Sequence, residues 1–345
     1  MVFLSPVASV KWLLFSTIGL PAAARSRLVA GLLAALAISL LGWTTPLSAQ
    51  DQGKKKAAAA GPEDVTLTTD DSLKLVLSYY AGNNGQESTP VLLLHGFRGS
   101  RKDFTKDNGL ASYLQEKLGC AVIVPDLRGH GESTAVKGGK PLKAETLQPR
   151  QFSLMTTQDL RAIKNFLWEK NNAKELNIDK LCVIGTEMGA SLALIYAADD
   201  AQGYEQMMSA YGPLKLGQFV RLMVLISPDT SVRGLTTNIN KALAMPVVKN
   251  SVPVMLLVGG KGNNSRLTDT ERLFKIITRA RGPVPEDADA VTVWYKKLDT
   301  SLQGIKLVDE ESLRVPERIG KVLTALLKRL DAKKYAWKLR KAPHE

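Results

Sequence analysis

The stretch that most constrains the fold is Leu181–Leu194, with the sequence LCVIGTEMGASLAL. An apolar run suited to a buried strand leads into a turn, and a run rich in Ala and Leu that suits a helix follows. Gly185 and Gly189 stand two residues before and two residues after Glu187. Glycines at this spacing allow a sharp turn from strand to helix that lifts the central side chain above a parallel sheet. We therefore expect Glu187 at the apex of such a turn.

Apolar runs of strand length alternate with helical patterns along most of the chain. This alternation predicts a mostly parallel sheet of about eight strands with helices on both faces. An opening hairpin is expected around Asp70 and Asp71, and the later strand-like runs are residues 91–94, 121–125, the apolar start of the 181–194 stretch, 220–227, 253–259 and 290–295. Helical periodicity covers residues 110–118, 156–170, the run from the glycine turn to about residue 198, 268–279 and 313–330. The short stretch between the runs at 220–227 and 253–259 leaves no room for a large lid domain.

Two further motifs stand in register with this alternation. The run LHGF occupies residues 94–97, and DLRGHGES occupies residues 126–133. Together with GTEMG at residues 185–189, they occur in the order and spacing of α/β-hydrolases. Over residues 64–330 the chain resembles the serine-hydrolase branch of esterases and lysophospholipase-like proteins. The resemblance implies an α/β-hydrolase fold in this range, whereas the function has to be argued from the site.

The resemblance places a nucleophilic serine at the apex of the turn, but this chain has Glu187 there. Some relatives use an aspartate at that position, and their covalent intermediate is hydrolysed by a water that a histidine activates. A glutamate is one methylene longer than an aspartate, so its attacking oxygen is displaced from the productive position. Catalysis through Glu187 would therefore need an unorthodox site.

The family's general base lies in the loop after the last strand, which corresponds here to Lys297–Gly304. That segment contains no histidine. The three histidines of the chain are His95, His130 and His344, and the first two belong to the LHGF and DLRGHGES motifs. We interpret His95 and His130 as hydrogen-bonded structural residues, with a relocated base as the alternative.

The acid of the triad is also missing from its usual place. The run after the strand at 253–259 is GGKGNN, without an aspartate. Asp229, after the preceding strand, is a substitute, although Pro228-Asp229-Thr230 is ordinary turn chemistry. Because all three triad positions are substituted, we interpret the chain as a catalytically inactive hydrolase-like protein with a ligand- or partner-binding role. The alternative is a hydrolase that acts on ester or amide bonds through Glu187.

The resemblance also implies an anion-binding hole built from backbone N–H groups. These groups belong to Met188 and to Phe97 or Arg98, and the helix N-terminus adds a positive dipole end. We predict that the Glu187 carboxylate accepts hydrogen bonds from these donors and fills the hole. The alternative is an exposed glutamate at the start of a helix.

The N-terminus has the composition of a targeting segment. Residues 1–49 contain three basic residues and no acid, with an apolar run at 28–43 and small residues near 48–49. This pattern predicts a cleaved signal peptide and an exported protein, with a membrane anchor as the alternative. Residues 50–63 are polar and Ala-rich and are expected to form a flexible linker.

The remaining expectations concern charge, thiols and cofactors. The net charge is +13, and residues 331–345 form a basic C-terminal tail. Basic residues on the last helix and tail suit either a solvated face or attachment to an anionic envelope or membrane surface; nucleic acid is not expected as a partner. Cys120 and Cys182 are expected to be buried free thiols on strands that are not neighbours. No residue spacing suggests a metal site or a cofactor.

Overall fold

The structure is a computed structural model that describes residues 61–211, 218–283, 285–287, 290–330 and 332–340; of residues 203–211 it describes the backbone only. The expected signal segment, most of the linker and His344 lie outside these residues. Within the described part, no helix has both the length and the apolar character that crossing a bilayer requires.

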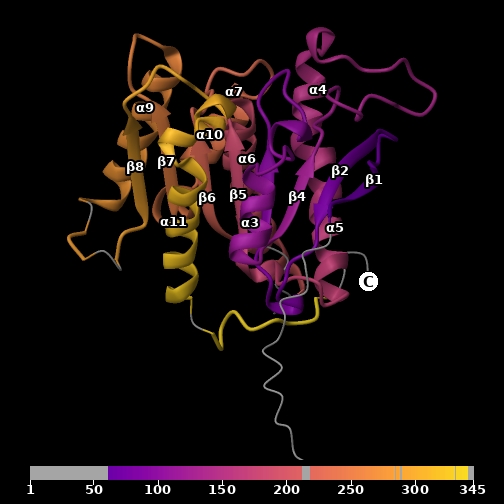
Figure 1. Ribbon diagram of the computed structural model, residues 1–345. Helices are drawn as coiled ribbons and strands as arrows, with labels where there is room; N and C mark the ends of the chain where they lie inside the picture. Colours follow the sequence, from indigo (N-terminus) through magenta and orange to yellow (C-terminus); the bar gives the residue numbers. More distant parts are fainter. Residues whose placement is uncertain (1–60, 212–217, 284, 288–289, 331, 341–345) are drawn as a thin grey trace, which may run out of the picture. The chain divides into compact units, whose positions relative to one another are not determined.

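A central sheet of eight strands runs in the order β1-β2-β4-β3-β5-β6-β7-β8 (Figure 1). The strands are β1 (Glu63–Thr68), β2 (Lys74–Tyr80), β3 (Pro90–Leu94), β4 (Ala121–Pro125), β5 (Leu181–Thr186), β6 (Val220–Ile226), β7 (Val254–Gly259) and β8 (Val293–Leu298). β2 pairs antiparallel with both β1 and β4, and all other pairs are parallel. This topology confirms the expected α/β-hydrolase fold.

Helices cover both faces of the sheet. The helices are α3 (Leu110–Leu118), α4 (Pro149–Leu154), α5 (Leu160–Asn172), α6 (Met188–Tyr211), α7 (Thr236–Ala244), α8 (Pro246–Asn250), α9 (Ser265–Arg281), α10 (Ile305–Asp309) and α11 (Val315–Arg329). One apolar core lies between the sheet and α3, α10 and α11, and the other lies between the sheet and α4–α9. Residues 227–253, between β6 and β7, hold only α7 and α8, so the expected absence of a large lid is confirmed.

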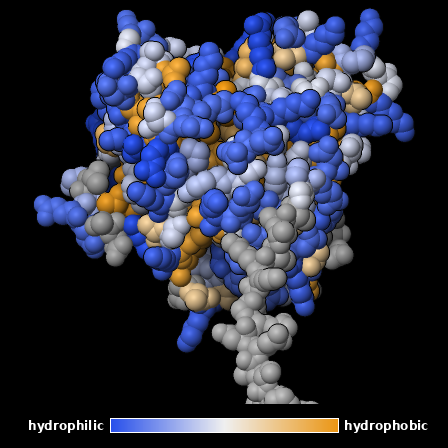
Figure 2. Space-filling view, viewed as in Figure 1, coloured by the Kyte–Doolittle hydropathy of each residue, from blue (hydrophilic) through white to orange (hydrophobic). Residues whose placement is uncertain are grey.

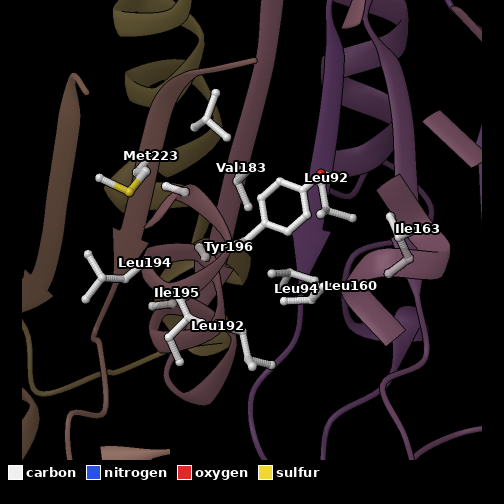
Figure 3. Packing of buried hydrophobic residues seen from close by; sticks show 14 of the residues in the cluster. Leu92, Leu94, Leu160, Ile163, Val183, Leu192, Leu194, Ile195, Tyr196 and Met223 are labelled. Carbon is white, nitrogen blue, oxygen red and sulfur yellow. The ribbon is translucent and has the colours of Figure 1, made fainter. Parts of the chain in front are cut away.

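The side chains of β3 show how one strand serves both cores. Val91 and Leu93 pack on the α3 and α11 side, whereas Leu92 and Leu94 pack on the α6 side. In Figure 3, Leu92 and Leu94 lie near Tyr196 of α6. Each fully buried leucine contributes roughly 1.5–3 kcal/mol relative to an exposed one, and a strand buried on both faces reads as an unbroken apolar run.

The two thiols are free and buried, as predicted. Cys182 lies on β5 beside Val91 of β3, and Cys120 directly precedes β4. β3 lies between β4 and β5 in the sheet, so the strand that follows Cys120 does not pair with the strand that holds Cys182.

The last strand begins three residues later than the apolar pattern suggests: it was expected at 290–295 and runs Val293–Leu298. β8 is an edge strand, and only its end residues Val293 and Leu298 are buried. An edge strand needs little apolar sequence, so its boundaries are poorly marked in the pattern. The helix expected at 156–170 is likewise divided into a π-helical turn at Met155–Asp159 and α5.

Residues 332–340 of the basic C-terminal segment return to the domain and contact the C-terminal end of α5. The indole Nε1 of Trp168 donates to the Arg340 carbonyl at 2.9 Å, and the amide of Asn177 donates to the Tyr335 carbonyl at 2.9 Å. Trp337 Nε1 donates to the Asn171 carbonyl at 2.9 Å. Figure 2 shows one face of the molecule, which is mostly hydrophilic with small apolar areas between the charged side chains.

Candidate functional site

The turn between β5 and α6 has the sharp geometry that its glycines predict. Glu187 occupies its apex with φ of +50°, a left-handed conformation, and its N–H donates to the Ile226 carbonyl at 2.9 Å. A Cβ on Gly185 would lie 2.2 Å from the Gly189 carbonyl carbon, and a Cβ on Gly189 would lie 2.0 Å from the Leu94 carbonyl oxygen. Neither position has room for a side chain, so the two glycines are required by the close approach of α6 to the sheet.

The Glu187 side chain lies between two other glycines. A Cβ on Gly96 would meet Glu187 Oε2 at 2.5 Å, and a Cβ on Gly304 would meet Glu187 Cδ at 2.8 Å. Gly304 has φ of +58°, so it is also a position that favours glycine for its backbone conformation. The loops after β3 and β8 therefore enclose the carboxylate from two sides.

Within the described chain, the Glu187 carboxylate accepts no hydrogen bond. The predicted hydrogen bonds from Met188 and from Phe97 or Arg98 are thus not formed, and this part of the prediction is wrong. The carboxylate instead lies against Gly96, the residue directly before Phe97. Burial raises the pKa of Glu187 above its ordinary value. Of the neighbouring charges, Arg266 lowers this pKa and Asp229 raises it, each by less than burial does.

His95 is fully buried and uses both ring nitrogens within the scaffold. The Leu127 N–H donates to Nε2 at 2.9 Å, so Nδ1 carries the proton and donates to the Gly96 carbonyl at 2.7 Å. Burial, with the neighbouring His130 ring, lowers the pKa of His95 to about 4. His95 therefore remains neutral at neutral pH and has no nitrogen left to act as a base.

His130 makes one of its two hydrogen bonds. Its Nδ1 lies 2.9 Å from the Arg128 carbonyl, while Nε2 has no partner in the described chain. The ring packs against His95 and Phe97, with centroid distances of 5.1 and 5.7 Å. Neither His95 nor His130 is hydrogen-bonded to Glu187 in the described structure.

His95 gives the fold a defined pH dependence. Its pKa is about 4 in the folded protein and about 6.5 in an unfolded chain. As pH falls below about 6.5 the unfolded chain takes up the proton first, so about 3 kcal/mol of stability present above that pH is lost by about pH 4. Urea unfolding should therefore give a free-energy difference between the parent and His95→Asn that shrinks as pH falls. A difference that stays constant would contradict this protonation scheme.

Gln303 occupies the loop where the family's base was expected. Its Nε2 donates to the Gly259 carbonyl at 3.0 Å, and its Oε1 accepts from the Ser227 hydroxyl at 2.8 Å. The Ser227 oxygen in turn accepts from the Gly304 N–H at 2.9 Å. Gln303 is not among the predicted site residues; its place directly before Gly304, in the loop after the last strand, is the signal that would have identified it.

Asp229 lies at the site but its carboxylate is already engaged. Oδ2 forms an ion pair with Arg266 of α9 at 2.8 Å, and Oδ1 accepts from the Ser231 N–H at 3.0 Å. The Asp229 N–H donates to the Glu187 carbonyl at 3.2 Å. Asp229 thus holds the elbow and α9 together, and no histidine is hydrogen-bonded to it in the described residues.

A cavity of about 430 Å³ opens beside the elbow. Charged and apolar side chains share its lining, which consists of Phe97, Ala144, Glu145, Leu147, Phe152, Glu187, Met188, Asp229, Ser231, Val232, Arg233 and Arg266. The volume falls within the range of small-molecule sites, roughly 300–1,000 Å³. Of the predicted site residues, Glu187, Met188, Phe97 and Asp229 line this cavity, whereas His95 does not.

Arg98 lies outside this lining. It has φ of +63° and follows Phe97 in a turn closed by a hydrogen bond from the Gly99 N–H to the Gly96 carbonyl at 3.0 Å. Its guanidinium lies 3.9 Å from Glu145, and both side chains are exposed. In the part of the chain that the structure describes, no cluster of His, Cys, Asp and Glu has the arrangement of a metal site.

Comparison with known sequences agrees with the fold. A family model described as alpha/beta hydrolase fold matches residues 89–233. Lipase 1 of Psychrobacter immobilis is 29% identical over 136 residues, covering 39% of this chain and 34% of the lipase. Lipase 3 of Moraxella sp. (strain TA144) is 28% identical over 177 residues, covering 49% of this chain and 47% of the lipase. The chain thus spans less than half the length of these curated relatives.

Solved structures show the same fold at low identity. An esterase of Pyrococcus furiosus superposes with a TM-score of 0.51 at 19% identity, covering 78% of this chain and 90% of the esterase. An esterase of Rhizomucor miehei gives a TM-score of 0.51 at 16% identity, covering 77% and 83%. The strand order, the elbow and the family model matched over residues 89–233 agree on the α/β-hydrolase fold, and esterases and lipases are among the proteins that this chain resembles.

Proposed function

We propose that this protein is a catalytically inactive member of its superfamily that binds a small-molecule ligand in the cavity beside Glu187. The observation that carries the proposal is the absence of a hydrogen-bonded base at the elbow: within the described residues, neither His95 nor His130 is bonded to Glu187. Gln303, in the loop that carries the base in the family, is bonded to Ser227 and Gly259 instead.

Acyl transfer through Glu187 would require a group that activates water. A carboxylate that attacked an ester carbonyl would form a mixed anhydride, and turnover would then depend on an activated water. General base catalysis contributes roughly 10²–10⁴-fold in rate, and the buried His95 has a pKa of about 4 with both nitrogens occupied. The cavity itself is retained, so the fold supports binding without the means of cleavage.

Export is part of the same proposal. The basic and apolar pattern of residues 1–49 favours a signal peptide or, as the alternative, a membrane anchor. The excess of basic residues would then favour contact with an anionic envelope or membrane surface.

Hydrolysis of ester or amide bonds through Glu187 is the alternative function. Two observations favour it: burial raises the pKa of Glu187 toward a range useful for proton transfer, and the curated relatives are named lipases. In that case Glu187 would act as a nucleophile or as an acid–base group.

Hydroxylamine trapping tests the proposal. The protein is incubated with an activated aryl acetate and hydroxylamine, and the peptide containing Glu187 is analysed by mass spectrometry. We expect an unmodified Glu187, because no acyl group is transferred to it. A hydroxamate at Glu187 would reveal an acylated intermediate and would overturn the proposal in favour of the alternative.

A further inference from the structure

We propose that the cavity beside Glu187 selects a cationic ligand, namely an ammonium group on a small apolar body, and that the ammonium pairs with the Glu187 carboxylate. This inference rests on the proposed binding function. It adds the class of ligand, which neither the fold nor the relatives supply.

The charges that line the cavity are paired, with two exceptions. Asp229 and Arg266 form an ion pair at 2.8 Å, and Glu145 lies 3.9 Å from Arg98. Among the described residues, the two exceptions are Glu187 and the exposed Arg233. Arg266 is neutralised by Asp229, and Arg233 is exposed to solvent. The partly buried Glu187 is therefore the charged group in the cavity that a ligand could pair with.

A carboxylate in this state gains most from a cationic donor. Removing a charged group from water is costly unless it is paired and hydrogen-bonded, and a charge-assisted hydrogen bond to an ammonium supplies both interactions. The charged groups that act on Glu187 are Arg266, Asp229, Asp103 and Lys306, two of each sign. Glu145 and Arg233 complete the charged lining. The positive and negative charges around Glu187 nearly cancel. An anionic ligand would therefore be repelled by the Glu187 carboxylate.

The rest of the cavity suits an apolar body. Five apolar side chains larger than alanine line it, namely Phe97, Leu147, Phe152, Met188 and Val232. Phe97 is 41% exposed, whereas most large apolar side chains among the described residues are buried, and its ring lies T-shaped against His130. The Arg98 guanidinium already lies over the Phe97 ring, 5.5 Å from its centroid, so the apolar lining contributes packing against the apolar body of the ligand and the carboxylate contributes the contact with the ammonium.

The position of the carboxylate is also fixed in advance. Gly96 and Gly304 approach it so closely that a Cβ at either position would lie within 2.8 Å of a Glu187 side-chain atom. Fixing the acceptor before binding lowers the entropy cost of association. The two glycines therefore hold the Glu187 carboxylate in a fixed position where a ligand can bind it.

Isothermal titration of the full protein with benzylammonium, benzyl alcohol and benzoate tests the inference. We expect benzylammonium to bind at least about tenfold more tightly than the other two probes, with this preference lost in Glu187→Gln because a charge-assisted hydrogen bond is removed. Glu271→Gln on α9 removes a carboxylate outside the cavity, paired with Lys297 at 3.6 Å, and should leave the preference intact. Thermal unfolding of each variant verifies that it folds.

Two outcomes of this titration would overturn the inference. Equal binding of benzyl alcohol and benzylammonium, unchanged in Glu187→Gln, would exclude the cationic ligand while leaving the proposed binding function in place. Failure of benzylammonium to bind at all would exclude the cationic ligand as well.

In the parent protein alone, the affinity for benzylammonium should fall as pH is lowered through the pKa of Glu187, because the protonated carboxyl loses its charge. An affinity independent of pH would contradict this role of Glu187. Failure of the proposed catalytic inactivity is detected separately, by acylation of Glu187.

Discussion

Gly189→Ala is expected to lower the free energy of unfolding by about 3 kcal/mol or more. The added Cβ would lie 2.0 Å from the Leu94 carbonyl oxygen and 2.6 Å from the His95 carbonyl oxygen. Both atoms are backbone, so no side-chain rotation can relieve the contact, and α6 has to move away from β3. Urea unfolding monitored by circular dichroism measures the loss.

Gly139→Ala is the matched control. A Cβ on Gly139 would make only an ordinary contact of 3.5 Å with the Val136 side chain. We expect a change within about 0.5 kcal/mol for this variant. Equal losses in Gly189→Ala and Gly139→Ala would mean that the close approach at the elbow is not what holds α6 against the sheet.

Arg128→Met is expected to lower the free energy of unfolding by about 3–5 kcal/mol. The Arg128 side chain is 2% exposed and forms ion pairs with Asp71 at 2.5 Å and with the fully buried Asp159 at 2.7 Å. The Arg128 guanidinium holds the pKa of Asp71 at about 2. Removing this cation leaves Asp159 buried without a counter-charge. Equilibrium unfolding in urea at neutral pH measures the effect.

Arg161→Met provides a control on the neighbouring pair. Arg161 pairs with Asp70, and both side chains are at least half exposed. Its loss is expected to cost less than about 1 kcal/mol, because exposed ion pairs contribute little. Arg128→Met/Asp159→Leu should recover part of the loss, since it removes the uncompensated charge together with its partner. A double variant less stable than Arg128→Met would contradict the burial argument.

The elbow could be predicted from sequence because it depends on local geometry. Gly185 and Gly189 are needed wherever a strand turns sharply into a helix that packs on its neighbour, and the two contacts at 2.0–2.2 Å show that requirement directly. The structural interpretation of His95 likewise agrees with its two hydrogen bonds to the backbone. The glycines of the elbow stand within one motif, and the hydrogen bonds of His95 join the LHGF and DLRGHGES motifs, whose order and spacing are visible in the sequence.

The conformation of the site could not be predicted in the same way. We expected the Glu187 carboxylate to fill the anion hole. It lies between Gly96 and Gly304 instead, and Gly304, which has no side chain to exclude it, is more than a hundred residues away in sequence. The Asp229–Arg266 pair joins the end of β6 to the start of α9, and Gln303 joins the ends of β6 and β7 through Ser227 and Gly259. Such contacts depend on how loops from different strands meet at one edge of the sheet, which no local pattern encodes.

The most direct test of the central claim, that the elbow carboxylate binds and does not cleave, is hydrolysis of a panel of short-chain aryl esters. The parent protein is assayed beside Glu187→Ala, with Glu271→Gln as a control for the loss of one carboxylate outside the cavity. We expect the same background rate for all three proteins. Turnover by the parent and by Glu271→Gln that disappears in Glu187→Ala would contradict it and would identify Glu187 as the catalytic residue of an active hydrolase.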